Sequence, residues 1–172
     1  MNIFYRKLAP IDAKAYREIR LESLKAHPES FGSSFEEQSQ RPKLMFEEAL
    51  ERPVDDRFII GAFDQDMLVG ICGFVPFVLE SFLELDHVGT LIQMYVGSTY
   101  RGKKVGLNLT TAVTKEAFKI PGIEQVVLGV RQDNLSAIRV YEQAGFLVYN
   151  SEGGDREVES LGFCQMILGR DQ

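Results

Sequence analysis

Periodic runs of apolar residues predict that helices alternate with strands along this chain. Four segments space their apolar residues three or four positions apart, which is typical of amphipathic helices. These segments cover residues 12–26, 43–51, 105–119 and 134–144. Asp12 is the predicted N-cap of the first helix, and Gly145 follows the last one, where a left-handed C-terminal cap is expected.

Shorter apolar runs bounded by turn residues predict the strands. They lie at residues 3–8, 58–63, 67–77, 87–96, 125–130, 146–149 and 158–168. The second and third form a predicted hairpin, as do the last two, which a loop at 152–155 connects. The polar stretch 29–42 is expected to be rich in turns. This order indicates an α/β (α+β) fold. We expect one domain over residues 1–172, with a mixed, mostly antiparallel sheet of about seven strands and about four helices.

Composition and charge exclude several classes of function. The net charge of −6 argues against broad nucleic-acid binding, which needs a basic surface. No apolar run reaches the roughly 20 residues that cross a bilayer, and the N-terminus lacks the apolar core of a signal peptide. We therefore predict a cytoplasmic protein without a membrane partner. Cys72 and Cys164 are predicted to be free, buried thiols. His27 and His87 have no companion ligands at metal-binding spacing, so no metal is expected.

The segment Arg101–Gly106 has the composition of a site for a phosphate-bearing ligand. It lies between a predicted strand and a predicted helix, where the first backbone N–H groups of the helix lack intrahelical partners. Three cations occur in these few residues of an otherwise acidic chain. A surface turn whose lysines serve solubility is the structural alternative.

Two motifs, about thirty residues apart, resemble those of the GNAT superfamily of N-acetyltransferases. The strand residues 93–96 and the following residues 100–106 are similar to the family's Arg/Gln-x-x-Gly-x-Gly/Ala motif. The segment 134–146 matches Asn-x-x-Ala followed by Tyr-x-x-x-Gly-Phe. The resemblance spans nearly the whole chain. It implies acetyl-CoA as co-substrate and direct transfer of the acetyl group, without a metal, to a primary amine of a small molecule or peptide.

The resemblance also implies roles for individual residues. The pantetheine arm would run beside the backbone of Met94, Tyr95 and Val96. The pyrophosphate would be wrapped by the turn residues Arg101, Gly102, Lys103, Lys104, Val105 and Gly106. Asn134 would contact the pantetheine portion. Tyr141 would stand near the thioester sulfur, where a phenol can protonate the departing thiolate. A strand N–H near Tyr95 or Val96 could stabilise the oxyanion. The structural alternatives are a helix N-cap for Asn134 and core packing for Tyr141.

Two departures from the family pattern bear on the function. Lys104 replaces the inner glycine of the first motif. Gly129 stands where protein N-terminal acetyltransferases carry a basic glutamate, which weakens an assignment to protein N-termini. It also keeps a non-catalytic acyl-CoA-binding or regulatory module open as an alternative. A nucleotide phosphotransferase is disfavoured, because the turn lacks the Gly-Lys-Ser/Thr of a P-loop.

The general base and the acceptor stay open at this stage. Candidate bases are Glu84, Asp86, His87, Gln93 and Tyr95, and a water chain to solvent is an equal alternative. Substrate specificity is expected from the N-terminal helices and from the segment 29–40, which includes Phe35, Glu36 and Glu37. The two carboxylates could attract a cationic amine, or they could simply be solvated. The stretch 78–86 would line the other wall. Exposed terminal strands make a homodimer a reasonable expectation.

Overall fold

The computed structural model describes residues 2–53, 56–76, 87–149 and 162–171. Seven strands form one sheet: β1 (Ile3–Lys7), β2 (Phe58–Asp64), β3 (Met67–Val75), β4 (Val88–Val96), β5 (Gln125–Arg131), β6 (Leu147–Val148) and β7 (Phe163–Gly169). The described helices are α1 (Ala13–Ala26), α2 (Phe35–Gln40), α3 (Met45–Glu51), α4 (Val105–Ala117) and α5 (Leu135–Gln143), with short 3-10 turns η1 (Pro10–Asp12), η2 (Pro28–Ser30) and η3 (Ser98–Tyr100).

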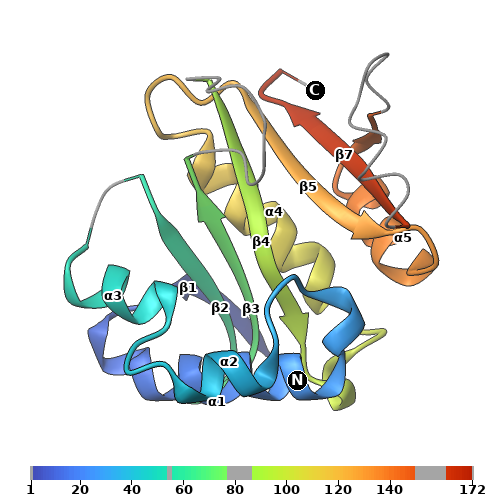
Figure 1. Cartoon of the computed structure of the whole chain (residues 1–172). Helices are drawn as coiled ribbons and strands as arrows, with labels where there is room; N and C mark the ends of the chain where they lie inside the picture. The colour runs from blue at the N-terminus through green and yellow to red at the C-terminus, as the bar shows by residue number, and fades with distance from the viewer. Residues whose placement is uncertain (1, 54–55, 77–86, 150–161, 172) are drawn as a thin grey trace.

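The sheet is mixed and mostly antiparallel, as predicted. Its strand order is β1-β2-β3-β4-β5-β7-β6, and the one parallel pair is β4 with β5. A parallel pair needs a crossover connection, which α4 provides. The two strands start side by side and then diverge, so that the sheet is open along the second half of β4 (Figure 1).

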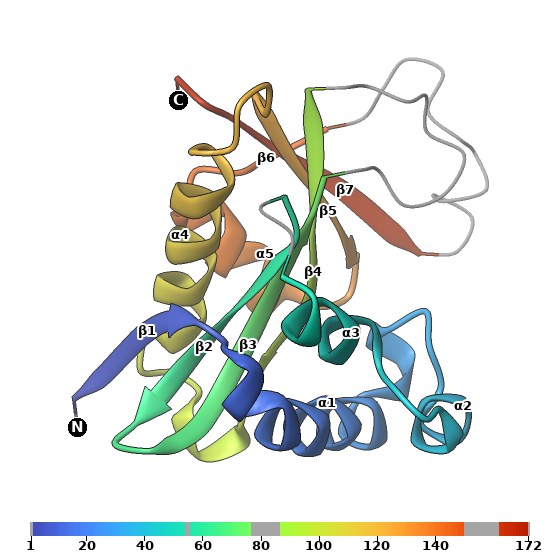
Figure 2. The same cartoon turned by 90° about the vertical axis from the view of Figure 1, so that its left-hand side faces the viewer.

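Helices cover both faces of the sheet (Figure 2). On one face, α4 and α5 bury a core that includes Val105, Leu109, Val113 and Tyr141. On the other face, α1 and α3 bury a second core around Tyr16, Ile19, Phe46 and Leu50. The sheet therefore has two separately packed sides, and the opening between β4 and β5 connects them.

The structure differs from the predicted elements in the N-terminal third. Residues Phe35–Gln40 form the short helix α2, which Ser34 caps by accepting a hydrogen bond from the Glu37 N–H at 3.1 Å. Asp12 does occupy the N-cap position of α1, but its carboxylate binds elsewhere. It accepts two hydrogen bonds from Arg6, at 2.6 and 2.9 Å, and one from the Ala9 N–H at 2.7 Å. The predicted stretch 78–86 and the loop 152–155 lie outside the described residues.

Gly89 allows β4 to pack closely against β3 where the parallel pair begins. A Cβ at this position would lie 2.1 and 2.3 Å from ring atoms of Phe74 and 3.0 Å from the Val75 carbonyl oxygen. The Phe74 ring is itself held, because it stacks on Phe58 with 5.4 Å between ring centroids. A Cβ at Gly129 on β5, in contrast, would meet no atom within 4 Å in the part of the chain that the structure describes.

We predict that Gly89→Ala destabilises the protein and that Gly129→Ala does not. Overpacking of this kind costs about 1–3 kcal/mol, which lowers the Tm of a chain of this size by at least ~2 °C. The matched change at Gly129 should shift the free energy of unfolding by less than about 0.5 kcal/mol. Thermal unfolding of both variants measures this, and equal Tm values for the two would contradict the predicted close packing.

Candidate functional site

The candidate site lies where β4 separates from β5. The two strands are paired at three positions, from Val88 with Gln125 to Thr90 with Val127. Beyond Thr90, β4 remains paired with β3 as far as Val96 opposite Gly70, and β5 remains paired with β7 as far as Arg131 opposite Phe163, but the two strands no longer pair with each other. The opening is at the carboxyl ends of a parallel pair, which is the general location of ligand sites in open α/β sheets.

A β-bulge marks the middle of the opened part of β4. Gln93 and Met94 together oppose Cys72 of β3, since Gly73 pairs with Ile92 and Ile71 pairs with Tyr95. Gln93 has a φ of +55°, a left-handed conformation that is uncommon for a residue other than glycine. The bulge holds the Gln93 side chain toward α1, where its Oε1 accepts a hydrogen bond from the Tyr16 hydroxyl at 2.9 Å. Bulges often re-aim side chains beside active sites.

The turn Arg101–Gly106 connects the end of β4 to the start of α4, as predicted. The backbone is left-handed at Gly102, with a φ of +71°, and at Lys104, with a φ of +61°. The first hydrogen bond along the helix runs from the Asn108 N–H to the Lys104 carbonyl at 3.0 Å. The N–H groups at the beginning of α4 therefore point out of the helix end without intrahelical partners, toward the C-terminal end of β4.

The cationic side chains of this turn are exposed and differ in how they are held. Arg101 donates through Nε to the Val96 carbonyl at 3.0 Å, and its Nη2 lies 2.8 Å from Nε2 of His27. Lys103 donates to the Thr99 carbonyl at 2.8 Å. Among the described residues, Lys104 forms no side-chain hydrogen bond or ion pair. The turn thus presents free backbone donors together with at least one unpaired positive charge.

Asn134 and Tyr141 lie on α5, which begins just after the diverging end of β5. Asn134 caps the helix by accepting a hydrogen bond from the Ala137 N–H at 3.2 Å, so its structural role is confirmed. Tyr141 is 6% exposed and packs edge-on against Phe146. Burial raises the pKa of the Tyr141 phenol, and the Cys72 thiol raises it further. Cys72 lies on β3 opposite the bulge at Gln93 and Met94.

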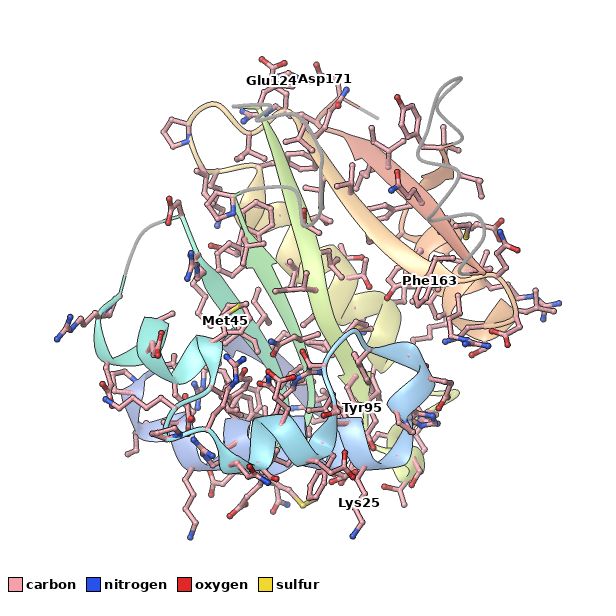
Figure 3. All side chains as sticks on the ribbon, viewed as in Figure 1. Lys25, Met45, Tyr95, Glu124, Phe163 and Asp171 are labelled. Carbon is pink, nitrogen blue, oxygen red and sulfur yellow. The ribbon has the colours of Figure 1, made fainter. Side chains whose placement is uncertain are left out.

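The hydroxyl of Tyr95 and the carboxylate of Glu22 lie on the α1 side of β4. The Tyr95 hydroxyl donates to Glu22 Oε1 at 2.7 Å, and Figure 3 shows Tyr95 at the lower end of β4 near α1. Burial, helped by the hydrogen bond to Glu22, raises the pKa of Tyr95 to about 12. A phenol with a raised pKa is a poorer base near neutral pH, so this environment disfavours Tyr95 as the base.

The remaining candidate bases are not gathered at the opening. His87 precedes β4 at the far end of the strand, where its carbonyl accepts hydrogen bonds from the Glu124 and Gln125 N–H groups. Gln93 lies six positions beyond His87 along the strand, a distance of roughly 20 Å. Glu84 and Asp86 lie outside the described residues.

The N-terminal segment that was expected to set specificity lies partly beside this opening. In Figure 1 the connection from α1 to α2 passes in front of the lower half of β4. His27 contacts Arg101 at the end of β4, and Glu29 is close enough to Arg131, at the end of β5, to raise its pKa. Glu37 forms an exposed ion pair with Arg41 at 2.5 Å, which agrees with a solvated surface role for that carboxylate.

Sequence reasoning missed Tyr16 and Arg20 on α1. Both are buried, with exposed fractions of 0% and 4%. They share the helical face of Ile19 and Ser23, at a spacing that normally identifies a core-facing stripe. That spacing was the available signal, because a solvated arginine would not be expected on that face.

The described residues contain no cluster of His, Cys, Asp and Glu side chains that could hold a metal ion. No described helix is long and apolar enough to span a bilayer. Cys72 and Cys164 are free thiols, as predicted, although Cys164 is only half-buried.

The fold is similar to that of several solved acetyltransferases. The PaiA N-acetyltransferase from Thermoplasma acidophilum, solved with coenzyme A, is 22% identical with a TM-score of 0.72, over 98% of this chain and 99% of that one. YncA from Salmonella typhimurium, a putative acetyltransferase solved with acetyl-CoA, is 20% identical with a TM-score of 0.73, over 100% and 96%. The aminoglycoside acetyltransferase AAC(6')-Ib, solved with coenzyme A, is 17% identical with a TM-score of 0.70, over 99% and 96%.

The sequence itself matches one family model. The model of the acetyltransferase (GNAT) family covers residues 16–146, which include most of α1, the opened strand β4, the basic turn and the whole of α5. This match spans more than half of the chain. The chain therefore belongs to the GNAT family of acetyltransferases.

Proposed function

We propose that this protein transfers the acetyl group of acetyl-CoA to a primary amine of a small molecule or peptide. The observation that carries the proposal is the opening of the parallel pair after Thr90, with the N-terminus of α4 at its end. The opened edge of β4 offers backbone groups to an extended pantetheine arm, and the turn 101–106 offers N–H groups and cations to a pyrophosphate. Neighbours of the same fold were solved with coenzyme A or acetyl-CoA.

The bulge is where the reaction would take place. An acceptor amine that approaches from the α1 face would attack the thioester carbon beside Gln93 and Met94. The tetrahedral oxyanion needs a nearby donor, which a backbone N–H of Met94, Tyr95 or Val96 would provide. The carbon–sulfur bond then breaks and the thiolate takes a proton from the phenol of Tyr141. The nitrogen loses its extra proton to solvent, and the Tyr141 phenoxide regains one from solvent. Among the described residues this phenol makes no hydrogen bond of its own, so it is available to the sulfur.

Lys104 tests the role of the basic turn because strain and charge predict opposite effects. A left-handed conformation costs about 1–2 kcal/mol in a residue with a Cβ, whereas glycine loses about 0.5–1 kcal/mol of backbone entropy. We therefore predict that Lys104→Gly raises the Tm of the cofactor-free protein by about 1–4 °C. Lys104→Ala keeps the strain and should not raise it. In both variants, loss of the charge should weaken acetyl-CoA binding by about 5-fold.

Thermal unfolding with and without acetyl-CoA measures both effects. Ligand at one hundred times Kd stabilises the wild type by about 2.7 kcal/mol, which is a shift of roughly 5–10 °C. Lys115→Ala removes an exposed lysine from the last turn of the same helix and is the matched control that keeps the full shift. No stabilisation of the wild type by acetyl-CoA would contradict the cofactor assignment.

Tyr141→Phe tests the proton donor. We predict that kcat falls by about 100-fold while the KM for acetyl-CoA stays unchanged, because the hydroxyl acts only on the departing thiolate. The Tm should hardly change, since no described residue hydrogen-bonds to this hydroxyl. Burial raises the pKa of Tyr141, so the phenol stays protonated and its ionisation should not limit the rate on the alkaline side.

Release of free thiol from acetyl-CoA with a panel of amines provides the rates for this test. Tyr149→Phe, at an exposed tyrosine beside the sheet edge, is the control that should keep full activity. Full activity of Tyr141→Phe would remove the proton-donor role. If acetyl-CoA raises the Tm but no amine is acetylated, the alternative of a non-catalytic acyl-CoA-binding module is favoured instead.

A further inference from the structure

Arg20 is a buried cation without a carboxylate partner among the described residues. It is 4% exposed, and its Nε is fully buried without a hydrogen-bond partner. The one hydrogen bond that the described residues offer its guanidinium is a long contact of 3.4 Å from Nη1 to the Ser23 hydroxyl. The Phe31 ring covers the guanidinium at 4.7 Å. Burial lowers the pKa of Arg20 to about 10, which still leaves it charged near neutral pH.

The environment of Arg20 differs from that of four arginines that form ion pairs in the structure. Arg6, Arg17, Arg41 and Arg131 each contact a carboxylate, on Asp12, Glu47, Glu37 and Asp133 respectively. All four of those arginines are more exposed than Arg20. An isolated buried charge is costly, and proteins normally pair it or use it. Of these five arginines, Arg20 is therefore the most deeply buried and the one without a carboxylate partner among the described residues.

The position of Arg20 places this charge beside the reaction centre. It lies one helical turn after Tyr16, whose hydroxyl binds the bulge residue Gln93 at 2.9 Å. Phe31, which covers it, belongs to the connection that runs from His27 beside β4 toward Glu29 beside β5. The guanidinium is thus on the α1 face, the side from which the acceptor would approach.

On β5, Gly129 contributes no side chain to the same side of the sheet. Val126, Leu128 and Val130 point into the core beneath α4, so Gly129 faces the α1 side by strand alternation. A Cβ there would meet no atom of the described residues within 4 Å. A glutamate at this position would repel an anionic acceptor, whereas glycine adds no charge and leaves space for the acceptor.

We propose that Arg20 binds a carboxylate of the acceptor, so that the amine acetylated by this protein is an amino acid or a close derivative with its carboxylate near the accepting nitrogen. This inference rests on the proposed function and names the substrate class for that site. An arginine fork binds a carboxylate through two parallel hydrogen bonds, and burial strengthens them. The buried nitrogen and the absent counter-charge would both be satisfied when the substrate binds. Polycationic amines, including aminoglycosides, would be repelled and should be poor acceptors.

The experiment compares each amino acid with the amine that its decarboxylation gives, such as phenylalanine with phenethylamine and leucine with isopentylamine. Spermidine and kanamycin serve as polycationic probes. We expect kcat/KM for the best amino acid to exceed that for its decarboxylated partner by at least about 100-fold, because a site built around a polar group rejects the analogue that lacks it. The thiol-release assay with saturating acetyl-CoA gives these ratios.

Arg20→Met should reduce that ratio to below about 5, mainly through a higher KM for the amino acid. Arg20→Lys keeps the charge but loses the fork and should give an intermediate ratio. The matched control is Lys14→Met, which removes a cation that is 90% exposed on the same helix and should leave the ratio unchanged. Because methionine replaces an uncompensated charge by a side chain of similar length, Arg20→Met should remain folded with a Tm close to that of the wild type.

Three results would overturn the proposal. The first is a ratio near one for every pair, or no turnover of any carboxylate-bearing amine. The second is a ratio that Arg20→Met leaves intact. The third is a Tm more than ~10 °C lower for Arg20→Met, because it would show that Arg20 is paired within the protein. A wild type that acetyl-CoA does not stabilise would instead contradict the proposed function itself, so the two failures are distinguishable.

Discussion

The structure depends on one constraint, which is that β4 cannot hydrogen-bond to β5 along its whole length. Three residue pairs hold the two strands together, and beyond them each strand keeps only its other neighbour, β3 for β4 and β7 for β5. An unpaired strand inside a sheet is costly, because its backbone groups need partners. The opening therefore suits a ligand that supplies those partners, and the bulge at Gln93 and the helix ends of α4 and α5 are arranged around it.

Two sets of positive charge flank this opening in an acidic protein, and they differ in their burial. Arg101, Lys103 and Lys104 are exposed, so solvent and salt screen them and they would act mainly in attraction and positioning. Arg20 is buried on the other face, where a charge is screened far less and discriminates strongly between ligands. This contrast agrees with a cofactor that keeps its phosphates in solvent and an acceptor that is enclosed.

Much of the fold could be predicted from the sequence, because the long elements from β4 to α5 have strong apolar periodicity and distinct turn residues. The parts that could not be predicted depend on tertiary contacts. Helix α2 has six residues and a single large apolar side chain, too few for periodicity, although Ser34 followed by Glu37 was a usable capping signal. The bulge was invisible because a glutamine, not a glycine, adopts the left-handed conformation at position 93.

The candidate site was predictable only where a motif marks it. The turn 101–106 and Asn134 lie where they were expected, and Lys104 keeps the backbone conformation of the glycine that it replaces. Arg20 belongs to no motif, and an arginine in a helix is normally solvated. Its spacing placed it on the core-facing side of α1, but the packing of α1 against the sheet was needed to show that the side chain is enclosed with no counter-charge among the described residues.

An acceptor carboxylate bound to Arg20 would also ease the step for which the described residues offer no evident base. An attacking amine must first lose a proton, and a neighbouring carboxylate opposes that loss because it stabilises the ammonium form. When the guanidinium neutralises the carboxylate, the pKa of the ammonium falls toward the value of about 8 that an α-amino group has without such a neighbour. Proton loss to water near neutral pH then becomes accessible without a dedicated side chain. Binding and activation of the acceptor would in this way depend on the same buried charge.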